Sequence, residues 1–189
     1  MGMEIGGPAA NRVTVTRSEA LSPEMATAVR ALLWAAFGDG EDAMTEDDWQ
    51  HAAVGVHFVA EIDGEIVAYA SVAERALEIA GRPLRTGYVE AVATAVERQG
   101  LGIGSQLMRE VSDYIRAGFQ LGALGTGRHA FYERLGWRTW QGQTLVRTAD
   151  GPRRTPDEDG YILVLPTPAS PELDLTAPIS CDSRLGDAW

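Results

Sequence analysis

The chain has 189 residues, a formal net charge of −11, and 45% hydrophobic residues. This length suits one domain, and the negative charge argues against a nucleic-acid partner, which is bound mainly through its phosphates. No apolar run approaches the roughly 20 residues of a membrane span, and we see no signal peptide. Cys181 is the only cysteine, which excludes an intrachain disulfide. We therefore expect a cytoplasmic protein without a membrane partner.

The hydrophobic pattern predicts strands and helices after a Gly-rich, mobile segment at residues 1–11. Ser22-Pro23 and a capping box at Thr45–Asp48 indicate helix starts, and Asp63-Gly64 predicts a hairpin turn. The expected elements are, in chain order, a strand at 12–16, a helix at 23–36, a short helix after 45, strands at 54–62 and 65–72, a turn at 80–82, a strand at 84–94, a helix at 103–115, a strand at 120–124, a helix at 130–135, strands at 137–148 and 161–165 that form a hairpin, and an irregular, Pro-rich tail. This order predicts one α/β (α+β) domain over residues 12–189, with a mixed, mostly antiparallel sheet flanked by helices.

Three glycines, Gly100, Gly102 and Gly104, alternate between a predicted strand and a predicted helix. Backbone N–H groups and the helix dipole make such a loop an anion site, and we expect a pyrophosphate there. A Walker loop needs a Lys, and the chain contains none. A Rossmann turn needs a third glycine where Ser105 stands, and a parallel βαβ unit rather than hairpins before it. A tight turn without a ligand is the remaining alternative.

The stretch Gln99-Gly-Leu-Gly-Ile-Gly104 resembles the acyl-CoA pyrophosphate loop of the GNAT superfamily, Q-x-x-G-x-G. Segments 87–93, 120–124, 154–160 and 181–189 are similar to aminoglycoside 2′-N-acetyltransferases of the mycobacterial type, and the resemblance runs from about Arg12 to the end. It implies a GNAT fold, acetyl-CoA as acyl donor, no metal, and a homodimer. The activity that it implies is acetylation of the 2′-amine of aminoglycoside antibiotics, a cationic small-molecule substrate, with resistance as the outcome.

Acetyl transfer to an amine requires a base for the ammonium, polarisation of the thioester carbonyl, and an acid for the leaving thiolate. The resemblance implies Glu90 as the base, acting directly or through a water, Tyr132 as the acid, and the Val92 N–H at the carbonyl. The alternatives are a solvated position of Glu90 at the sheet edge or its ion pair with Arg85, and a core role for Tyr132. The residues that we expect to bind acetyl-CoA are Val92, Ala93, Thr94, Arg98, Gln99, Gly100, Leu101, Gly102, Ile103 and Gly104.

Aminoglycosides are polycations, so their site should be rich in carboxylates. The chain has two acidic clusters, one at 39–48 and one after Asp150. The substrate residues that the resemblance implies are Asp42, Asp48, Glu90, Ala91, Gly125, Asp157, Glu158, Asp187 and Trp189. We also expect the Trp189 ring to pack on a sugar face. Glu158 and Gly125 stand where the family has Asp and Ser, which leaves the drug spectrum open.

Other residues favour no further chemistry. His51, His57 and His129 share no metal-ligand spacing, and Cys181 is expected to be a packed or partly exposed thiol. Two other functions stay open: a GNAT enzyme acting on another amine, such as a polyamine or a protein N-terminus, and a silent module that binds CoA or a polycation.

Overall fold

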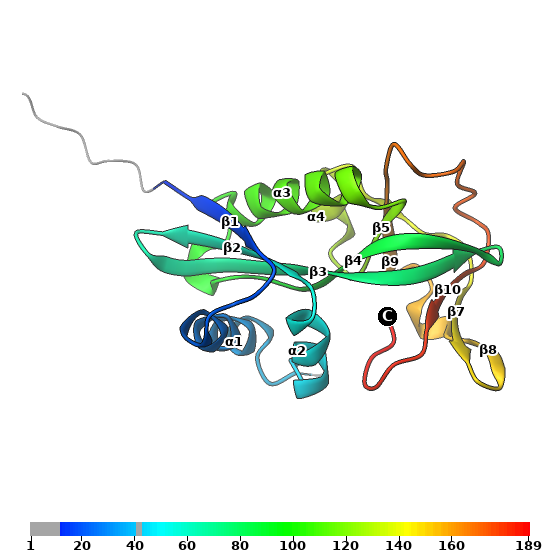
Figure 1. The fold of residues 1–189 in the computed structure, drawn as a ribbon, viewed down its shortest axis with the longest axis horizontal. Helices are drawn as coiled ribbons and strands as arrows, with labels where there is room; N and C mark the ends of the chain where they lie inside the picture. The colour runs from blue at the N-terminus through cyan, green and yellow to red at the C-terminus, as the bar shows by residue number, and fades with distance from the viewer. Residues whose placement is uncertain (1–11, 41–42) are drawn as a thin grey trace, which may run out of the picture.

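A computed structural model describes residues 12–40 and 43–189, so the predicted mobile segment 1–11 and the predicted substrate residue Asp42 lie outside the described residues. Within these ranges one curled sheet has helices on both faces (Figure 1). This architecture confirms the predicted fold class. No helix in the same ranges is long and apolar enough to cross a membrane.

The strands of the sheet are β1 (Thr14–Ser18), β2 (Val56–Ile62), β3 (Glu65–Ile79), β4 (Arg82–Thr94), β5 (Leu121–Gly125), β6 (Arg138–Thr139), β7 (Thr144–Thr148), β8 (Gly151–Arg154), β9 (Ile162–Pro166) and β10 (Ile179–Asp182). Their order is β6-β9-β5-β4-β3-β10-β7-β8, and β2 and then β1 branch from β3. The pairs β4–β5 and β10–β7 are parallel, and the other pairs are antiparallel. The sheet is therefore mixed and mostly antiparallel, as predicted.

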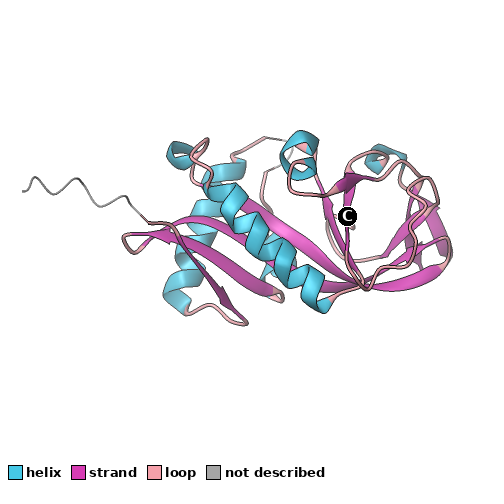
Figure 2. Ribbon diagram, turned by 90° about the horizontal axis from the view of Figure 1, so that it is seen from above, coloured by secondary structure: helices cyan, strands magenta, loops and turns pink. Residues whose placement is uncertain are grey.

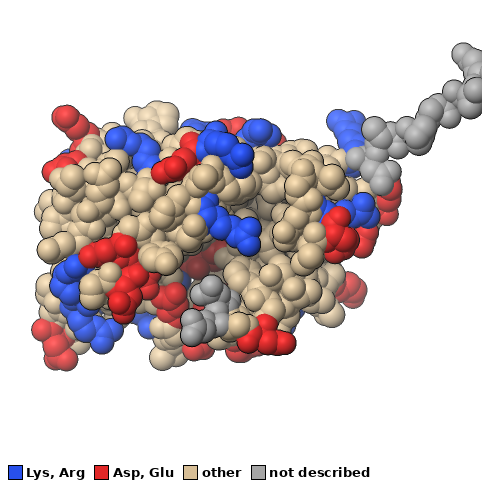
Figure 3. All heavy atoms as spheres, turned by 180° about the vertical axis from the view of Figure 1, so that it is seen from behind, with Lys and Arg blue, Asp and Glu red and all other residues tan. Residues whose placement is uncertain are grey.

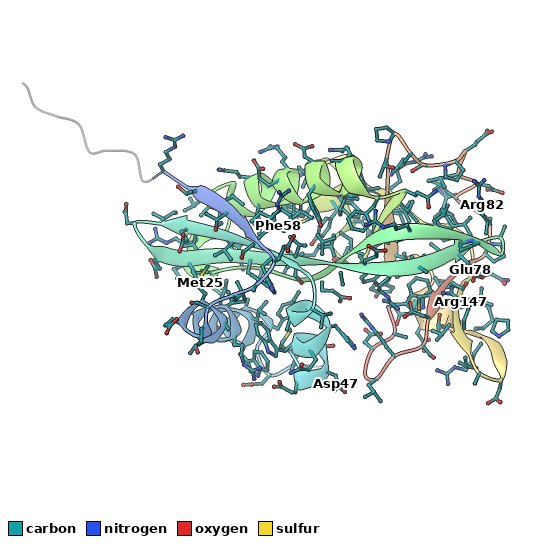
Figure 4. All side chains as sticks on the ribbon, in the orientation of Figure 1. Met25, Asp47, Phe58, Glu78, Arg82 and Arg147 are labelled. Carbon is teal, nitrogen blue, oxygen red and sulfur yellow. The ribbon has the colours of Figure 1, made fainter. Side chains whose placement is uncertain are left out.

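Helices cover the two faces of the first half of the sheet (Figure 2). The helix α3 (Ile103–Gly118) lies on one face, where its apolar stripe packs with Phe58, which points toward it in Figure 4. The helices α1 (Pro23–Phe37) and α2 (Glu46–Ala53) lie on the other face. Shorter helical turns are η1 (Val96–Arg98), α4 (His129–Glu133) and η2 (Pro156–Glu158).

Local sequence patterns explain where these elements begin and turn. The Ser22 hydroxyl accepts a hydrogen bond from the Met25 N–H at the start of α1, and Thr45 and Asp48 form the predicted capping box of α2. Both predicted hairpin turns are present, at Asp63–Gly64 and at Ala80–Gly81. However, β3 runs to Ile79 rather than to residue 72, because its alternating pattern continues to the second turn.

The predicted strand 137–148 is wrong as one element, because the chain leaves the sheet in its middle. β6 ends at Thr139 and β7 begins at Thr144. Between them, the N–H groups of Gln141 and Gly142 donate to the Leu175 carbonyl instead of to a strand. The predicted hairpin is also wrong: β7 forms its hairpin with β8, while β9 pairs with β5 and β6.

The tail is not wholly irregular, which corrects a second expectation. Ile179–Asp182 form β10, which fills the position between the far end of β3 and β7. Four residues among prolines carry little strand pattern of their own, so this strand depends on partners distant in the sequence. The C-terminus then lies within the curl of the second half of the sheet (Figure 2).

Candidate active site

A cleft opens where β4 and β5 separate. Their parallel pairing covers only Thr86 to Tyr88 of β4, although this strand runs on to Thr94. Beyond the last pair lies a cavity of about 830 Å³. Residues lining it are Ala36, Phe37, Val92, Ala93, Thr94, Arg98, Gln99, Gly100, Gly102, Ile103, Gly104, Ser105, Arg109, Arg128, Phe131, Tyr132, Arg134 and Leu135. Of the ten residues predicted to bind the cofactor, only Leu101 is absent from this lining, and its side chain is exposed.

The glycine loop forms the cleft wall at the start of α3. Gly100 and Gly102 have φ values of +77° and +82°, which side-chain-bearing residues rarely adopt. Gly104 is small for another reason, since a Cβ there would lie 3.1 Å from the Thr94 hydroxyl oxygen. No side chain caps α3 at Gly102, so the first-turn N–H groups have no partner within the helix. They are free donors for an anion.

Four arginines line the same cleft, and sequence reasoning named only Arg98. Arg98 makes a long ion pair with Glu65, at 3.4 Å. Arg109, Arg128 and Arg134 have no carboxylate within ion-pair distance among residues 12–40 and 43–189. Arg128 and Arg134 lie within four residues of the predicted acid Tyr132, and this closeness in the sequence could have identified them. Together these side chains make the cleft basic in an acidic protein.

Tyr132 projects from α4 into this cleft. Its side chain is mostly buried, with edge-to-face contacts to Phe131 and Trp137. Burial raises the pKa of Tyr132 to about 12, against a smaller lowering by Arg128. The hydroxyl therefore keeps its proton near neutral pH and can act as a proton donor.

A β-bulge in β4 decides which way Glu90 points. Tyr69 of β3 lies opposite Ala93, but Ser71 lies opposite Glu90, so Ala91 and Val92 share one partner position. Ala91 accommodates the extra residue with φ at +51°. Residues directly opposite in an antiparallel pair project to the same face, so Glu90 and Ala93 share the α1/α2 face. A bulge also opens the ladder locally, and the Val92 N–H lies at this opening.

The Glu90 carboxylate is buried and paired with Arg184 of the tail, not with Arg85. The Arg184 Nη1 lies 2.6 Å from the Glu90 Oε1, and Arg85 pairs instead with Glu74. His51 of α2 lies in the same surroundings, and its buried Nδ1 has no hydrogen-bond partner. Burial and Arg184 lower the pKa of His51, while Glu90 and Asp48 oppose this shift. Sequence reasoning assigned no role to Arg184 or His51.

The structure brings most predicted substrate carboxylates together at the C-terminus. Burial raises the pKa of Glu158, and the nearby charges of Asp187 and Asp157 raise it further. Gly186 packs against the Asp47 side chain, which joins the tail to α2 beside Asp48. A Cβ added at Gly125, at the end of β5, would lie 3.9 Å from the main-chain carbon of Trp189. Arg184 pairs with Glu90 and also donates to the Asp187 carbonyl, so this acidic region lies next to Glu90.

The Trp189 ring does not form the open sugar-stacking face expected from the sequence. It is only 6% exposed and packs in a cluster that includes Tyr88 and Trp140. Its indole N–H donates to the Thr155 hydroxyl at 3.1 Å. The Trp189 ring is therefore a core side chain and not an open face for a sugar.

His57 and Cys181, for which the sequence predicts no catalytic role, are buried in the core. His57 bonds to the Tyr69 hydroxyl inside the core, at 2.7 Å. Cys181 is buried, and burial raises its pKa to about 11, as expected for a packed thiol. Among the residues that the structure describes, no group of three His, Cys, Asp or Glu side chains is arranged to hold a metal.

The site therefore has a basic part and an acidic part, which adjoin near the β4 bulge. The cleft presents N–H groups and arginines, and the neighbouring tail presents carboxylates. Figure 3 shows a face hollowed near its centre, with basic side chains on one side and acidic side chains on another. The basic cleft, which Val92–Thr94 line, and the acidic region, which Arg184 joins to Glu90, thus lie at neighbouring positions of β4.

Comparison with known proteins agrees with this geometry. Residues 19–140 match the family model described as an acetyltransferase (GNAT) domain. An aminoglycoside 2′-N-acetyltransferase from Mycolicibacterium fortuitum is 41% identical over 174 residues, which are 89% of this chain and 87% of that protein.

Solved structures show the same fold at low sequence identity. A GNAT family acetyltransferase from Brucella melitensis, in complex with acetyl-CoA, has a TM-score of 0.61 and 19% identity, covering 90% of this chain and 96% of that one. A GCN5-related N-acetyltransferase from Kribbella flavida has a TM-score of 0.57 and 23% identity over 69% of this chain, which spans only 34% of that longer chain.

Proposed function

This chain belongs to the GNAT acetyltransferases and, among them, to the aminoglycoside 2′-N-acetyltransferase family, and from that premise we propose that it acetylates the 2′-amino group of aminoglycosides with acetyl-CoA. The observation that carries the proposal is the meeting of a basic cleft and an acidic region at Glu90. The cytoplasmic location expected from the sequence and the homodimer implied by the family stay predictions.

The cleft fits acetyl-CoA in size, shape and charge. Its volume of about 830 Å³ is in the range of small-molecule sites. The loop N–H groups at Gly102 and Gly104 and the four cleft arginines suit a polyphosphate. The open edge of β4 at Val92–Thr94 suits the amides of a pantetheine arm. When bound, acetyl-CoA supplies an acetyl group activated as a thioester.

The residues around the bulge can then perform the three tasks of the transfer. Glu90 takes a proton from the substrate ammonium, directly or through a water, and the Val92 N–H donates to the thioester carbonyl. The neutral amine nitrogen bonds to the carbonyl carbon as the carbon–sulfur bond breaks, and it then releases its second proton to water, from which Tyr132 regains the proton that it donates. Tyr132 gives its proton to the departing sulfur, and its raised pKa keeps that proton available at neutral pH.

The acidic region suits a polycationic amine. Asp48, Asp157, Glu158, Asp187 and the terminal carboxylate of Trp189 offer negative charges around the position where the amine must lie. Acetylation removes one positive charge from the drug, which supports a role in antibiotic resistance.

The test is release of CoA thiol from acetyl-CoA by the purified protein with different acceptors. We expect turnover with gentamicin and tobramycin, which carry a 2′-amine, and none with kanamycin A, which carries a 2′-hydroxyl. Turnover of kanamycin A would show that another amine is attacked. No turnover with any drug, combined with turnover of a polyamine or a peptide N-terminus, would favour the other GNAT reading. Glu90→Gln should lower kcat by about 100-fold and keep acetyl-CoA binding.

A further inference from the structure

Arg184 and Glu90 form an ion pair that joins two distant parts of the chain. The Arg184 Nη1 donates to the Glu90 Oε1 at 2.6 Å, and Nη2 lies 3.4 Å from Oε2. The two side chains are only 14% and 10% exposed. No other described cation lies within ion-pair distance of Glu90. Glu90 is therefore oriented by a residue that comes from the tail.

The same guanidinium also holds the last residues of the chain. Its Nε donates to the Asp187 carbonyl at 2.7 Å, and Nη2 lies 3.4 Å from the Trp189 carbonyl oxygen. The Asp187 carboxylate in turn accepts the Trp189 N–H at 3.0 Å. A planar guanidinium presents its donors in a fixed fork. One rigid group thus sets the distance between Glu90 and the acidic C-terminal turn.

We infer that Arg184 is a positioning residue that acts through Glu90, an inference that rests on the proposed function. It fixes the position of the Glu90 carboxylate relative to the Asp187–Trp189 turn. An amine bound by the tail therefore lies close to the carboxylate that accepts its proton. Each carboxylate oxygen has two acceptor sites. The Glu90 Oε1 therefore keeps a site for the amine proton or for a water while it is bonded to Arg184.

A double-mutant cycle separates positioning from general stabilisation. We expect Arg184→Gln to lower kcat/KM for a 2′-amino drug about 100-fold, because the base loses its orientation, while the acetyl-CoA Kd changes less than about twofold. In a Glu90→Gln background, the same substitution should lower kcat less than about threefold, since residues that act as one unit are not additive, while the rise in drug KM from the released tail should remain. Losses of kcat that multiply in the double variant would overturn the inference.

Arg147→Gln is the matched control. Arg147 also joins β10 to its neighbours, because it donates to the Ser180 carbonyl and forms an ion pair with Glu78. The side chains of Arg147 and Glu78 lie together at the far end of the molecule (Figure 4). It touches neither Glu90 nor the last five residues, so its kcat/KM should stay within about twofold of wild type. If Arg184→Gln does not fold, Arg184→Lys replaces it, and we expect an intermediate loss because an ammonium lacks the fork.

A second readout keeps the inference distinct from the proposed function. Hydrogen exchange of residues 185–189 should quicken about tenfold in Arg184→Gln and not in Arg147→Gln, whatever the substrate is. Unchanged exchange would remove Arg184 from tail positioning. Wild-type protein that acetylates no 2′-amine would instead overturn the proposed function.

Discussion

Ser71 of β3 lies directly opposite Glu90 of β4, on one side of the bulge that offsets the two strands by one residue. Two residues before Ser71, Tyr69 already faces Ala93, so the strand alternation is broken at Ala91 and Val92. Without this break Glu90 and Ala93 would project to opposite faces. The bulge therefore brings the expected base and the cleft edge to one side of the sheet.

The backbone at Ala91 gives the first prediction. Its φ of +51° is unfavourable for any residue with a Cβ. We expect Ala91→Gly to raise the free energy of unfolding by about 1 kcal/mol in urea denaturation. Ala93→Gly, at an ordinary position of the same strand, should lower it by about 1 kcal/mol. A loss of stability in both variants would argue against the left-handed conformation at Ala91.

Removing the hydroxyl of Tyr132 tests the acid. Tyr132→Phe keeps the ring packing against Phe131 and Trp137, so the fold and the acetyl-CoA Kd should be unchanged. The kcat for a 2′-amino drug should fall about 100-fold, because the thiolate leaves without its proton. Steady-state kinetics together with calorimetric binding would measure both. A kcat within twofold of wild type would exclude the hydroxyl from the reaction.

The same tyrosine makes the stability of the fold depend on pH in the alkaline range. Burial raises the folded-state pKa of Tyr132 to about 12, above the unfolded value near 10. The folded state therefore holds the proton more tightly, so this contribution is complete below pH 10 and is lost as pH rises toward 12. We expect the alkaline loss of stability in Tyr132→Phe to be smaller than in wild type over that window. Urea denaturation at pH 8, 10 and 11 would measure the difference.

The cleft arginines should bind acetyl-CoA through its phosphates. We expect Arg109→Gln and Arg134→Gln each to weaken acetyl-CoA binding about tenfold, because each removes a charge-assisted hydrogen bond. The affinity of both variants should also depend less on salt. Arg138→Gln, an exposed arginine of β6 outside the cleft, is the control for the loss of one charge. Equal affinity in all three variants would place the phosphates elsewhere.

Asp187 tests the acidic tail without removing Trp189. Asp187→Asn keeps an acceptor for the Trp189 N–H but removes the charge. The drug KM should rise about tenfold, equivalent to ~1.4 kcal/mol, and the acetyl-CoA Kd should not change. Asp174→Asn, in the same tail, where the Asp174 carboxylate accepts hydrogen bonds from Thr176, makes the same change in net charge. The assignment fails if the two variants raise KM equally.

The sequence by itself determined the features that depend on neighbouring residues. Caps at Ser22 and Thr45, the turns at Asp63–Gly64 and Ala80–Gly81, and the glycine loop are set by interactions within about four residues. The resemblance to GNAT enzymes rests largely on that loop and on short segments like it. For the same reason, nine of the ten predicted cofactor residues line the cleft.

Only the tertiary structure decided that the tail lies beside Glu90. Arg184 and Glu90 are 94 residues apart, and β10 exists because β3 and β7 leave a position for four residues from a Pro-rich segment. The cleft arginines come from separate elements, and the burial of the Trp189 ring depends on Tyr88 and Trp140. Such contacts follow from sheet register and packing across the whole chain, which no local pattern encodes.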